Sequence, residues 1–376
     1  MMNIAIDIDD TLTDSFDYFQ PYVAEYFASD TETLRQRNIS YSNLPEEWKR
    51  DELGFCRRYF GRVVPDTPFK PDAAASVRKL RAAGHRIVII TGRTDLLYTD
   101  PYATTEDELR RGGIEYDKLI CTFDKGGACR AENISVIVDD MIANCDAAEA
   151  AGIPAIVFDS KANRDAETLH RRAADWNAVL HEIAMIERGY PDRLTAEELL
   201  CAALELNPGP WGDHSRTAAM YAERIASAAG MDAEKAYIVG LLHDIGRRFL
   251  VRDLGHIYYG YRYMTTLGYS AVARVCLTHS FPPKDFDIYI GKLDIPDDEV
   301  EEVRRLLDGI SFDDYDRLIQ LCDAAAGAGV VLDIEERMAD VKRRYGNYPQ
   351  VQWDRNIELM HYFGDKCGRD IYDICR

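Results

Sequence analysis

The first half of the chain alternates short apolar runs with segments of helical periodicity. Between or after the runs, helical patterns are predicted at 73–83, 106–111, 125–132 and 143–151, with a long closing helix at 164–188. The runs have the length and β-branched content of buried strands, and they lie at 3–8, 85–90, 118–121, 134–138 and 153–158. Strands that alternate with helices at this spacing predict a Rossmann-like, parallel α/β sheet.

An aromatic-rich segment, about 14–70, interrupts this alternation after the first strand. It has helical spacing and no strong strand pattern, and Pro65, Pro68 and Pro71 mark its end. We predict a small helical cap. Its aromatic side chains are expected to form its own core, because small helical units need large side chains to bury enough area. A base-stacking platform is the alternative.

Strand patterns nearly vanish beyond Gly189-Tyr190-Pro191, which we interpret as a linker. Thr195 to Glu198 resembles a helix start with a capping box, and helical patterns continue to the C-terminus. A chain of 376 residues is long for one compact core. We therefore expect an α/β domain over 1–189 and an all-α domain over 190–376, in which 346–376 extend the helical pattern without a recognisable motif.

Composition narrows the classes of function. The chain is 47% hydrophobic and 29% charged, with a net charge of −20, so binding to a nucleic-acid polymer is not expected. No apolar run approaches a membrane span and no signal peptide is visible. Nine cysteines without paired spacing indicate reduced thiols. These features predict a cytoplasmic protein whose partner is a small molecule rather than a membrane.

Polar side chains lie at the end of three of the predicted strands or directly after it. They are Asp7 and Asp9, then Thr91 and Arg93, then Asp139 and Asp140. The carboxyl ends of parallel strands meet at one edge of a sheet, where α/β folds bind ligands. Two carboxylates at one strand tip repel each other unless a cation lies between them, and Mg²⁺ suits oxygen ligands. The alternative is that the first carboxylates only cap the next helix.

A second set of candidate ligands lies in the helical half. The apolar run 238–242 ends at His243 and Asp244, and a similar run, 318–322, ends at Asp323. Polar groups directly after buried runs are costly to desolvate unless they bind something, and a divalent metal would satisfy them. Single histidines are more often structural, but the full set points to a metal centre, and it consists of His214, His243, Asp244, His256, His279 and Asp323.

The first half resembles the haloacid dehalogenase (HAD) superfamily of phosphatases, and its 5′-nucleotidase-like branch most. The resemblance covers residues 1 to about 185. The motifs that carry it are Ile90-Thr91-Gly92-Arg93, Tyr116-Asp117-Lys118-Leu119-Ile120, Asp124-Lys125-Gly126 and Ile137-Val138-Asp139-Asp140, after the aspartates near the N-terminus.

This resemblance implies a role for each motif. Asp7 would attack phosphorus and form an aspartyl-phosphate, and Asp9 would protonate the leaving group and then activate water. Thr91 would bind the phosphoryl group and Lys125 would neutralise its charge, with Lys118 as the competing lysine. The substrate-binding and metal residues complete the set: Gly92 and Arg93 would contact substrate, while Asp7, Asp9 through its carbonyl, Asp139 and Asp140 would hold or support Mg²⁺.

The second half resembles the HD superfamily of metal-dependent phosphohydrolases over about 195–345. His243-Asp244-Ile245-Gly246 is similar to its signature, and His214 and Asp323 stand in the expected order. His256 and His279 resemble the dinuclear branch, such as the symmetrical diadenosine tetraphosphate hydrolases. Mixed imidazole and carboxylate ligands suit Fe, Mn, Co or Ni, as one ion or two. The alternative is that His256 and His279 are surface histidines.

Together the two resemblances imply a bifunctional phosphohydrolase. A Mg²⁺-dependent phosphomonoesterase would be fused to an HD hydrolase, both acting on small, nucleotide-like phosphates. An alternative is that the HD half is a non-catalytic, nucleotide-sensing module that regulates the phosphatase. Loss of a metal ligand would favour that module, and every expected ligand is present. A purely structural protein would leave two complete ligand sets unexplained.

Overall fold

The structure is a computed structural model that describes residues 1–375, apart from the side chains of Tyr345 and Cys375. The chain divides into two compact units. Unit 1 comprises Met1–Glu187 and Thr266–Gly268, and unit 2 comprises Arg188–Thr265 and Tyr269–Arg376. Each unit is described by itself.

Unit 1 is built on a six-stranded, fully parallel sheet, which confirms the predicted α/β class. The strand order is β3-β2-β1-β4-β5-β6, so β1 lies inside the sheet between β2 and β4. The strands are β1 (Asn3–Ile6), β2 (Arg86–Thr91), β3 (Lys118–Cys121), β4 (Val136–Asp139), β5 (Ala155–Phe158) and β6 (Arg171–Ala173).

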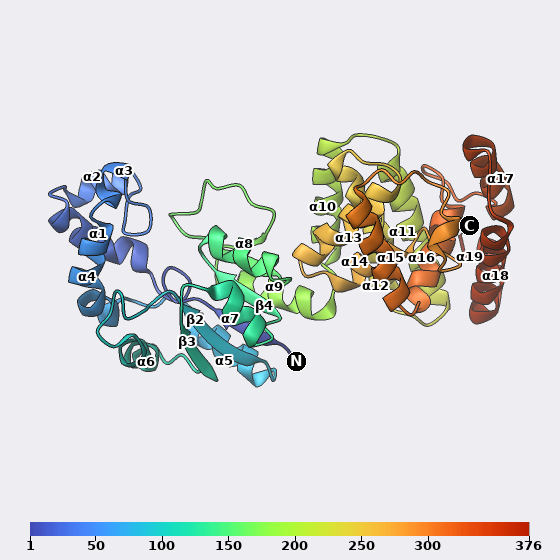
Figure 1. The fold of residues 1–376 in the computed structure, drawn as a ribbon. Coiled ribbons are helices and arrows are strands. Elements are labelled where there is room, and N and C mark those ends of the chain that lie inside the picture. Colours follow the sequence, from blue (N-terminus) through green and yellow to red (C-terminus); the bar gives the residue numbers. More distant parts are fainter. Residues whose placement is uncertain (376) are drawn as a thin grey trace. The chain divides into compact units, whose positions relative to one another are not determined.

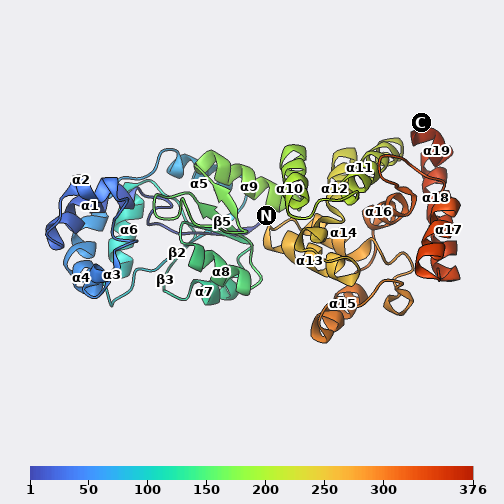
Figure 2. The same ribbon diagram turned by 90° about the horizontal axis from the view of Figure 1, so that it is seen from above.

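Helices cover both faces of this sheet (Figure 2). Successive side chains of a strand point to opposite faces, so each strand contributes to two cores. Ile4 and Ile6 of β1 pack in the core below α5 (Ala73–Ala82) and α9 (Trp176–Arg188). Ala5 packs in the core against α7 (Lys125–Ala131) and α8 (Ile142–Ala150). Burial on both faces explains why these strands are continuously apolar.

A helical cap follows β1, as the sequence predicts (Figure 1). Its buried centre is an aromatic cluster that includes Phe19, Phe55 and Tyr59, with ring centroids 5.2–6.3 Å apart in the pairs these three form. The aromatic side chains therefore form the core of the cap, as expected, rather than a platform for bases. The elements are α1 (Ser15–Tyr26), α2 (Thr31–Gln36), α3 (Glu46–Lys49), α4 (Glu52–Val63) and η1 (Val64–Asp66).

Two sequence-based expectations need correction. The predicted helix over 164–188 is a short strand, β6, followed by α9. The strand was hidden because it is polar: Arg171 binds Glu182 at 2.8 Å and Arg172 binds Asp159 at 2.7 Å, so ion pairs replace apolar packing. In unit 2, the first helix starts earlier than predicted.

That helix, α10 (Arg193–Leu206), is capped by Asp192 and not by Thr195. The carboxylate of Asp192 accepts a hydrogen bond from the amide of Thr195 at 2.8 Å. Asp is a strong N-cap residue, and the amide that it binds is one that the helix itself leaves without a partner.

Unit 2 is helical throughout its described residues, apart from one isolated bridge between Ala326 and Val331. Its buried centre includes α11, α12, α14 and α16, whose inward side chains are almost all apolar. Besides α10 the elements are α11 (Trp211–Ala228), α12 (Ala233–Leu242), η2 (Ile245–Phe249), α13 (Leu254–Thr266), α14 (Ser270–Thr278), η3 (Phe286–Ile288), α15 (Asp297–Gly309), α16 (Asp314–Ala325), α17 (Ile334–Tyr345), α18 (Gln350–Cys367) and α19 (Ile371–Cys375).

Within the described part of the chain, none of the helices combines the length and the apolar character that a membrane crossing requires. The eight cysteines described there are all free thiols.

Candidate metal centres

In unit 1 a buried lysine bridges two buried aspartates at the carboxyl edge of the sheet. The Nζ atom of Lys125 lies 2.6 Å from Oδ1 of Asp7 and 2.6 Å from Oδ2 of Asp139. Asp7 follows β1, Asp139 ends β4 and Lys125 opens α7. The pairing of β1 with β4 extends to Asp7, whose amide donates to the carbonyl of Val138 at 3.0 Å. Strand register therefore sets the distance between the two carboxylates.

Asp140 completes a set of three carboxylates that could hold a metal ion. Asp7, Asp139 and Asp140 each offer an oxygen within 4.8 Å of the others, and all three residues are buried. Asp139 is held by the amide of Met141 at 2.9 Å and by Asn144 at 3.0 Å. These contacts fix its orientation, as outer groups do for metal ligands.

The electrostatics of this set favour a divalent cation. Burial, reinforced by Asp139 and Asp9 and opposed by Lys125, raises the pKa of Asp7 to about 7. Burial and neighbouring carboxylates raise the pKa of Asp140 well above its usual value. Burial alone would lower the pKa of Lys125, but Asp139 and Asp7 outweigh it and raise that pKa. Burial and crowding thus disfavour the charged forms of Asp7 and Asp140 when only Lys125 balances them, and a divalent ion such as Mg²⁺ would displace their protons.

Thr91 ends β2, beside β1 in the sheet, as the sequence predicts. Its Oγ1 atom is buried and has no hydrogen-bond partner among the described residues, which fits a hydroxyl that awaits a ligand. Gly92 follows, and a Cβ there would lie 3.4 Å from the ring of Phe123. Lys118, the competing lysine, is half exposed and binds Glu132, so the structure brings Lys125 and not Lys118 to the carboxylates.

Asp9 and Arg93 form a separate pair. Arg93 donates to both oxygens of Asp9, at 2.8 and 3.1 Å, and its other side binds the buried carboxylate of Glu108. Ser15 also donates to Asp9 at 3.3 Å. The side chain of Asp9 therefore points to Arg93 and not into the set of Asp7, and Arg93 is 2% exposed between two carboxylates.

Two buried carboxylates that contact Arg93 or the residues after β1 were not predicted from the sequence. Glu108 lies on α6 (Pro101–Arg111) among exposed charged residues, and nothing in its spacing distinguishes it. Asp10 has a positive φ of 58°, accepts from the amide of Phe16 at 2.7 Å, and binds the hydroxyl of Tyr41 at 3.1 Å. Burial raises the pKa of Asp10 to about 7. It joins the strand end to the cap.

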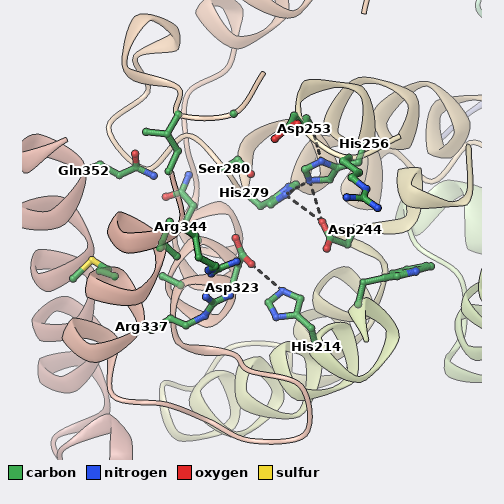
Figure 3. A pocket seen from close by; sticks show the side chains of 18 of the residues that line it. His214, Asp244, Asp253, His256, His279, Ser280, Asp323, Arg337, Arg344 and Gln352 are labelled. Carbon is green, nitrogen blue, oxygen red and sulfur yellow. Dashed lines mark hydrogen bonds and ion pairs between the residues drawn. The ribbon is translucent and has the colours of Figure 1, made fainter. Parts of the chain in front are cut away.

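In unit 2 the six predicted ligands converge on one centre. Figure 3 labels five of them: His214, Asp244, His256, His279 and Asp323. On one side, Nε2 of His214 lies 2.9 Å from Oδ1 of Asp323, and Nε2 of His243 lies 3.7 Å from the same oxygen. These three residues form one group whose ligand atoms lie within 4.8 Å of one another. They come from α11, the end of α12 and α16.

Asp244 connects this group to a second one. Its Oδ1 atom lies 3.8 Å from Nε2 of His243, 3.1 Å from that of His256 and 3.7 Å from that of His279. The Nε2 atoms of His256 and His279 are 3.2 Å apart. Both histidines are buried, so the structure does not support the alternative of surface histidines.

All four imidazoles are oriented in the same way. The Nδ1 atom of each faces a backbone carbonyl, so that each Nε2 points into the centre. The acceptors are Ala326 for His214 at 3.1 Å, Gly240 for His243 at 2.7 Å, Asp253 for His256 at 2.5 Å and Cys276 for His279 at 2.9 Å. This arrangement fixes the tautomer and is typical of metal-ligating histidines.

The ionisation of the centre also fits metal binding. Burial would lower the pKa of His243, but Asp244 and Asp323 outweigh it and raise that pKa to about 9. Burial and the neighbouring His243 lower the pKa of His279 to about 3. Nε2 of His243 is buried without a hydrogen-bond partner in the described part of the chain. A cation between these atoms would replace the proton and satisfy the orphaned nitrogen.

The centre opens into a cavity of about 870 Å³. Besides five of the six ligands, cationic and aromatic side chains line it: Arg247, Arg252, Lys292, Arg337, Arg344, Trp211, Tyr289 and Tyr348. A volume of this size accommodates a ligand of nucleotide dimensions. The lining residues beyond 327 were not predicted from the sequence, because no metal-ligand spacing marks them.

One family model matches this chain, and its match lies within unit 2. Residues 211–327 match the family described as HD domain, so unit 2 contains an all-helical HD region. None of the curated proteins matches the chain.

Several solved structures are similar to about half of the chain. A haloacid dehalogenase-like hydrolase from Streptococcus pneumoniae is 14% identical over 48% of this chain and 97% of its own, with a TM-score of 0.36. D,D-heptose 1,7-bisphosphate phosphatase from B. bronchiseptica, complexed with magnesium and phosphate, is 15% identical over 49% and 99%, with a TM-score of 0.31. Similarities of this size do not assign a function to unit 1.

Proposed function

We propose that this chain is a bifunctional phosphohydrolase. Unit 1 acts as a HAD-type, Mg²⁺-dependent phosphomonoesterase of the nucleotidase kind, and unit 2 acts as an HD-type phosphohydrolase on a small, nucleotide-like phosphate. The observation that carries the proposal is the orientation of the four histidines in unit 2, each anchored through Nδ1 so that Nε2 faces two carboxylates.

In unit 1, Asp7 is the nucleophile and Lys125 holds it in place. The bond from Lys125 to Asp7 fixes one carboxylate oxygen and leaves the other to attack phosphorus. Thr91 donates its unpartnered hydroxyl to the phosphoryl group. Bound Mg²⁺ would neutralise phosphoryl charge at Asp7, Asp139 and Asp140.

Asp9 is the acid and base of the same reaction, a role that requires its carboxylate to turn from Arg93 towards the phosphoryl group when substrate binds. In the first step it gives a proton to the leaving oxygen as the P–O bond breaks, and in the second it takes one from the water that attacks the aspartyl-phosphate. Arg93 and Ser15 orient its carboxylate in the substrate-free structure. This assignment makes Arg93 a positioning residue for Asp9 and not the substrate contact that the sequence predicts. The substrate contact of Gly92 stays a prediction.

In unit 2, the six side chains would hold one or two transition-metal ions. His214, His243 and Asp323 form one ligand set, and Asp244 forms the other with His256 and His279. Asp244 links the two sets, because its Oδ1 atom also lies 3.8 Å from Nε2 of His243. Metals bound there would supply activated water and a Lewis acid for the phosphate. The cationic lining of the cavity supports an anionic substrate in a chain whose net charge is −20.

A screen for phosphate release from phosphorylated metabolites tests the proposal on the full chain. It is run with Mg²⁺ and then with Mn²⁺, on the wild type, Asp7→Asn and His243→Ala. We expect each variant to lose one class of substrates and keep the other. If wild type releases no phosphate from any substrate with either metal, the proposed function is wrong.

A nucleotide-sensing module remains the second candidate for unit 2, because its cavity could bind a nucleotide without cleaving it. In that case His243→Ala would change the rate or substrate affinity of the unit 1 phosphatase, and no substrate would depend on His243 for its own hydrolysis.

A further inference from the structure

The cavity in unit 2 has a wall that lies outside the matched HD region. That region ends at residue 327, but α17 and α18 follow it and line the same cavity. Their contributions are Arg337, Met338, Val341, Arg344, Tyr348, Gln352 and Asn356. In Figure 3, Arg337, Arg344 and Gln352 approach from this wall, and Asp244 and His256 lie on the other side of the centre.

Positive charge is concentrated in this cavity. Among the described lining residues, five are Arg or Lys and three are Asp. Asp244 and Asp323 belong to the ligand sets of the metal centre, so bound divalent ions would offset their charge as well. The cavity therefore favours anions although the whole chain is strongly acidic.

Two arginines of the added wall stand next to the metal centre. Nε of Arg337 donates to the carbonyl oxygen of Ala326 at 3.4 Å, and the same oxygen faces Nδ1 of His214 at 3.1 Å. Arg337 is thus one backbone group away from a metal ligand. Nε of Arg344 lies 3.0 Å from Asp340, one turn earlier on α17 than Arg344 itself.

Asp340 forms ion pairs with three arginines of α17. Its carboxylate lies 3.7 Å from Arg337, 3.1 Å from Arg343 and 3.0 Å from Arg344. Asp340 brings one negative charge to the three positive charges of these arginines. Arginine forks match phosphate oxygens in geometry as well as in charge.

The end of α17 is held in position by a buried pair. The hydroxyl of Tyr348, in the turn to α18, accepts from Nδ2 of Asn356 at 2.8 Å, and both side chains are buried. This contact ties the turn to α18, and the same Nδ2 atom lies 3.5 Å from Sδ of Met338 on α17.

We propose that Arg337 and Arg344 bind a second phosphate group of the substrate, while the first phosphate lies at the His/Asp centre. The substrate class is therefore a molecule with two phosphate groups, linked or on one scaffold. This inference rests on the proposed function of unit 2, because it takes the metal centre as the site of the first phosphate.

Binding of two hydrolysis-resistant probes tests the proposal on the full chain loaded with Mn²⁺. Propylphosphonate carries one phosphonate, and propane-1,3-bisphosphonate carries two. By isothermal titration, wild type is expected to bind the bisphosphonate at least about tenfold more tightly than propylphosphonate. A factor of this size corresponds to one charge-assisted contact. Arg337→Ala combined with Arg344→Ala should remove this preference and leave the affinity for propylphosphonate unchanged.

Arg343→Ala is the matched control. Arg343 lies on the same helix, is 71% exposed and pairs with the same Asp340. Unlike Arg337 and Arg344, Arg343 does not line this cavity. The Arg343→Ala variant should keep the preference for the bisphosphonate. Any binding by unit 1 is common to all variants. If the double variant unfolds, the single variant Arg344→Gln replaces it in the test, because Arg344 is half exposed. This single substitution is expected to reduce the preference for the bisphosphonate.

The outcomes separate the two proposals. If wild type binds both probes equally, or the double variant keeps the preference with its metal content intact, the second-phosphate site is wrong and the phosphohydrolase proposal stands. If metal-loaded wild type binds neither probe, the centre is not a phosphate site and both proposals fail for unit 2.

Discussion

The two centres of this chain gather buried carboxylates in different ways. In unit 1, a lysine bridges two of three aspartates at strand ends, and the ligand atoms of this set are all carboxylate oxygens. In unit 2, two aspartates are surrounded by four imidazoles on helices, each anchored to a backbone carbonyl. The groups that contact the carboxylates are therefore imidazoles in unit 2 and the ammonium group of Lys125 in unit 1.

The difference predicts different metals and different tolerance to their loss. Oxygen ligands suit Mg²⁺, which keeps several waters and binds through few carboxylates. Imidazole and carboxylate together suit Mn, Fe, Co or Ni. Unit 1 should tolerate metal loss better, because Lys125 already balances part of the charge of its carboxylates. In unit 2, Nε2 of His243 is buried and has no hydrogen-bond partner among the residues that the structure describes.

Loss of the nucleophile should have the largest effect. Asp7→Asn is expected to reduce Mg²⁺-dependent release of phosphate from monoesters by about 10³-fold or more, because an amide is a poor nucleophile and a weaker metal ligand. Steady-state phosphate release measures it. Retention of more than a few per cent of wild-type activity would remove Asp7 from this role, whereas the Mn²⁺-dependent activity of unit 2 should be unchanged.

The shared carboxylate of unit 2 should come next. Asp244→Asn leaves the shape of the residue but removes the charge that faces His243, His256 and His279. We expect the hydrolase activity of unit 2 to fall by at least about 10²-fold, since Asp244 belongs to the second ligand set and links it to His243 of the first. Unit 1 activity in the same preparation is the internal control. An unchanged unit 2 activity would contradict the arrangement of ligands.

A substitution at one ligand set should have a partial effect. His279→Ala removes a ligand of the second set and leaves His214 and Asp323 in the first. Metal analysis of the fragment 190–376 should give about two ions per chain for the wild type and about one for the variant. A wild-type fragment that holds a single ion in excess Mn²⁺ or Fe²⁺ would show that the second set binds no metal.

Separating the two units should have the smallest effect. A chain truncated after Pro191 retains the sheet, both of its cores and the cap, so it should fold and keep the phosphatase activity of the full chain. Thermal unfolding and phosphate release measure this. If the truncated chain is insoluble or inactive and the full chain is active, the division at 189–190 is wrong.

The sequence predicted the framework of each centre well because strand ends and buried apolar runs leave direct signals. Four of the predicted residues lie at an end of a strand or helix whose periodicity is clear in the sequence: Asp7, Thr91, Lys125 and Asp139. The polar strand β6 had no such signal, because Arg171 and Arg172 are satisfied by ion pairs that only the fold brings together.

Contacts between distant segments were the main limit of prediction. The burial of Arg93 against Glu108, and the cap contact from Tyr41 to Asp10, join residues whose partners cannot be recognised from local spacing. The same is true of Arg337, which reaches the centre of unit 2 only because α17 folds back over α16's end at Ala326.

The most direct test of the contrast between the two centres is the metal content of the full chain after equilibration with Mn²⁺ and Mg²⁺ together and rapid gel filtration. The account predicts about two Mn²⁺ retained per chain, reduced to about one by His279→Ala and unaffected by Asp7→Asn. Retention of Mn²⁺ that depends on Asp7 and not on His279 would contradict it.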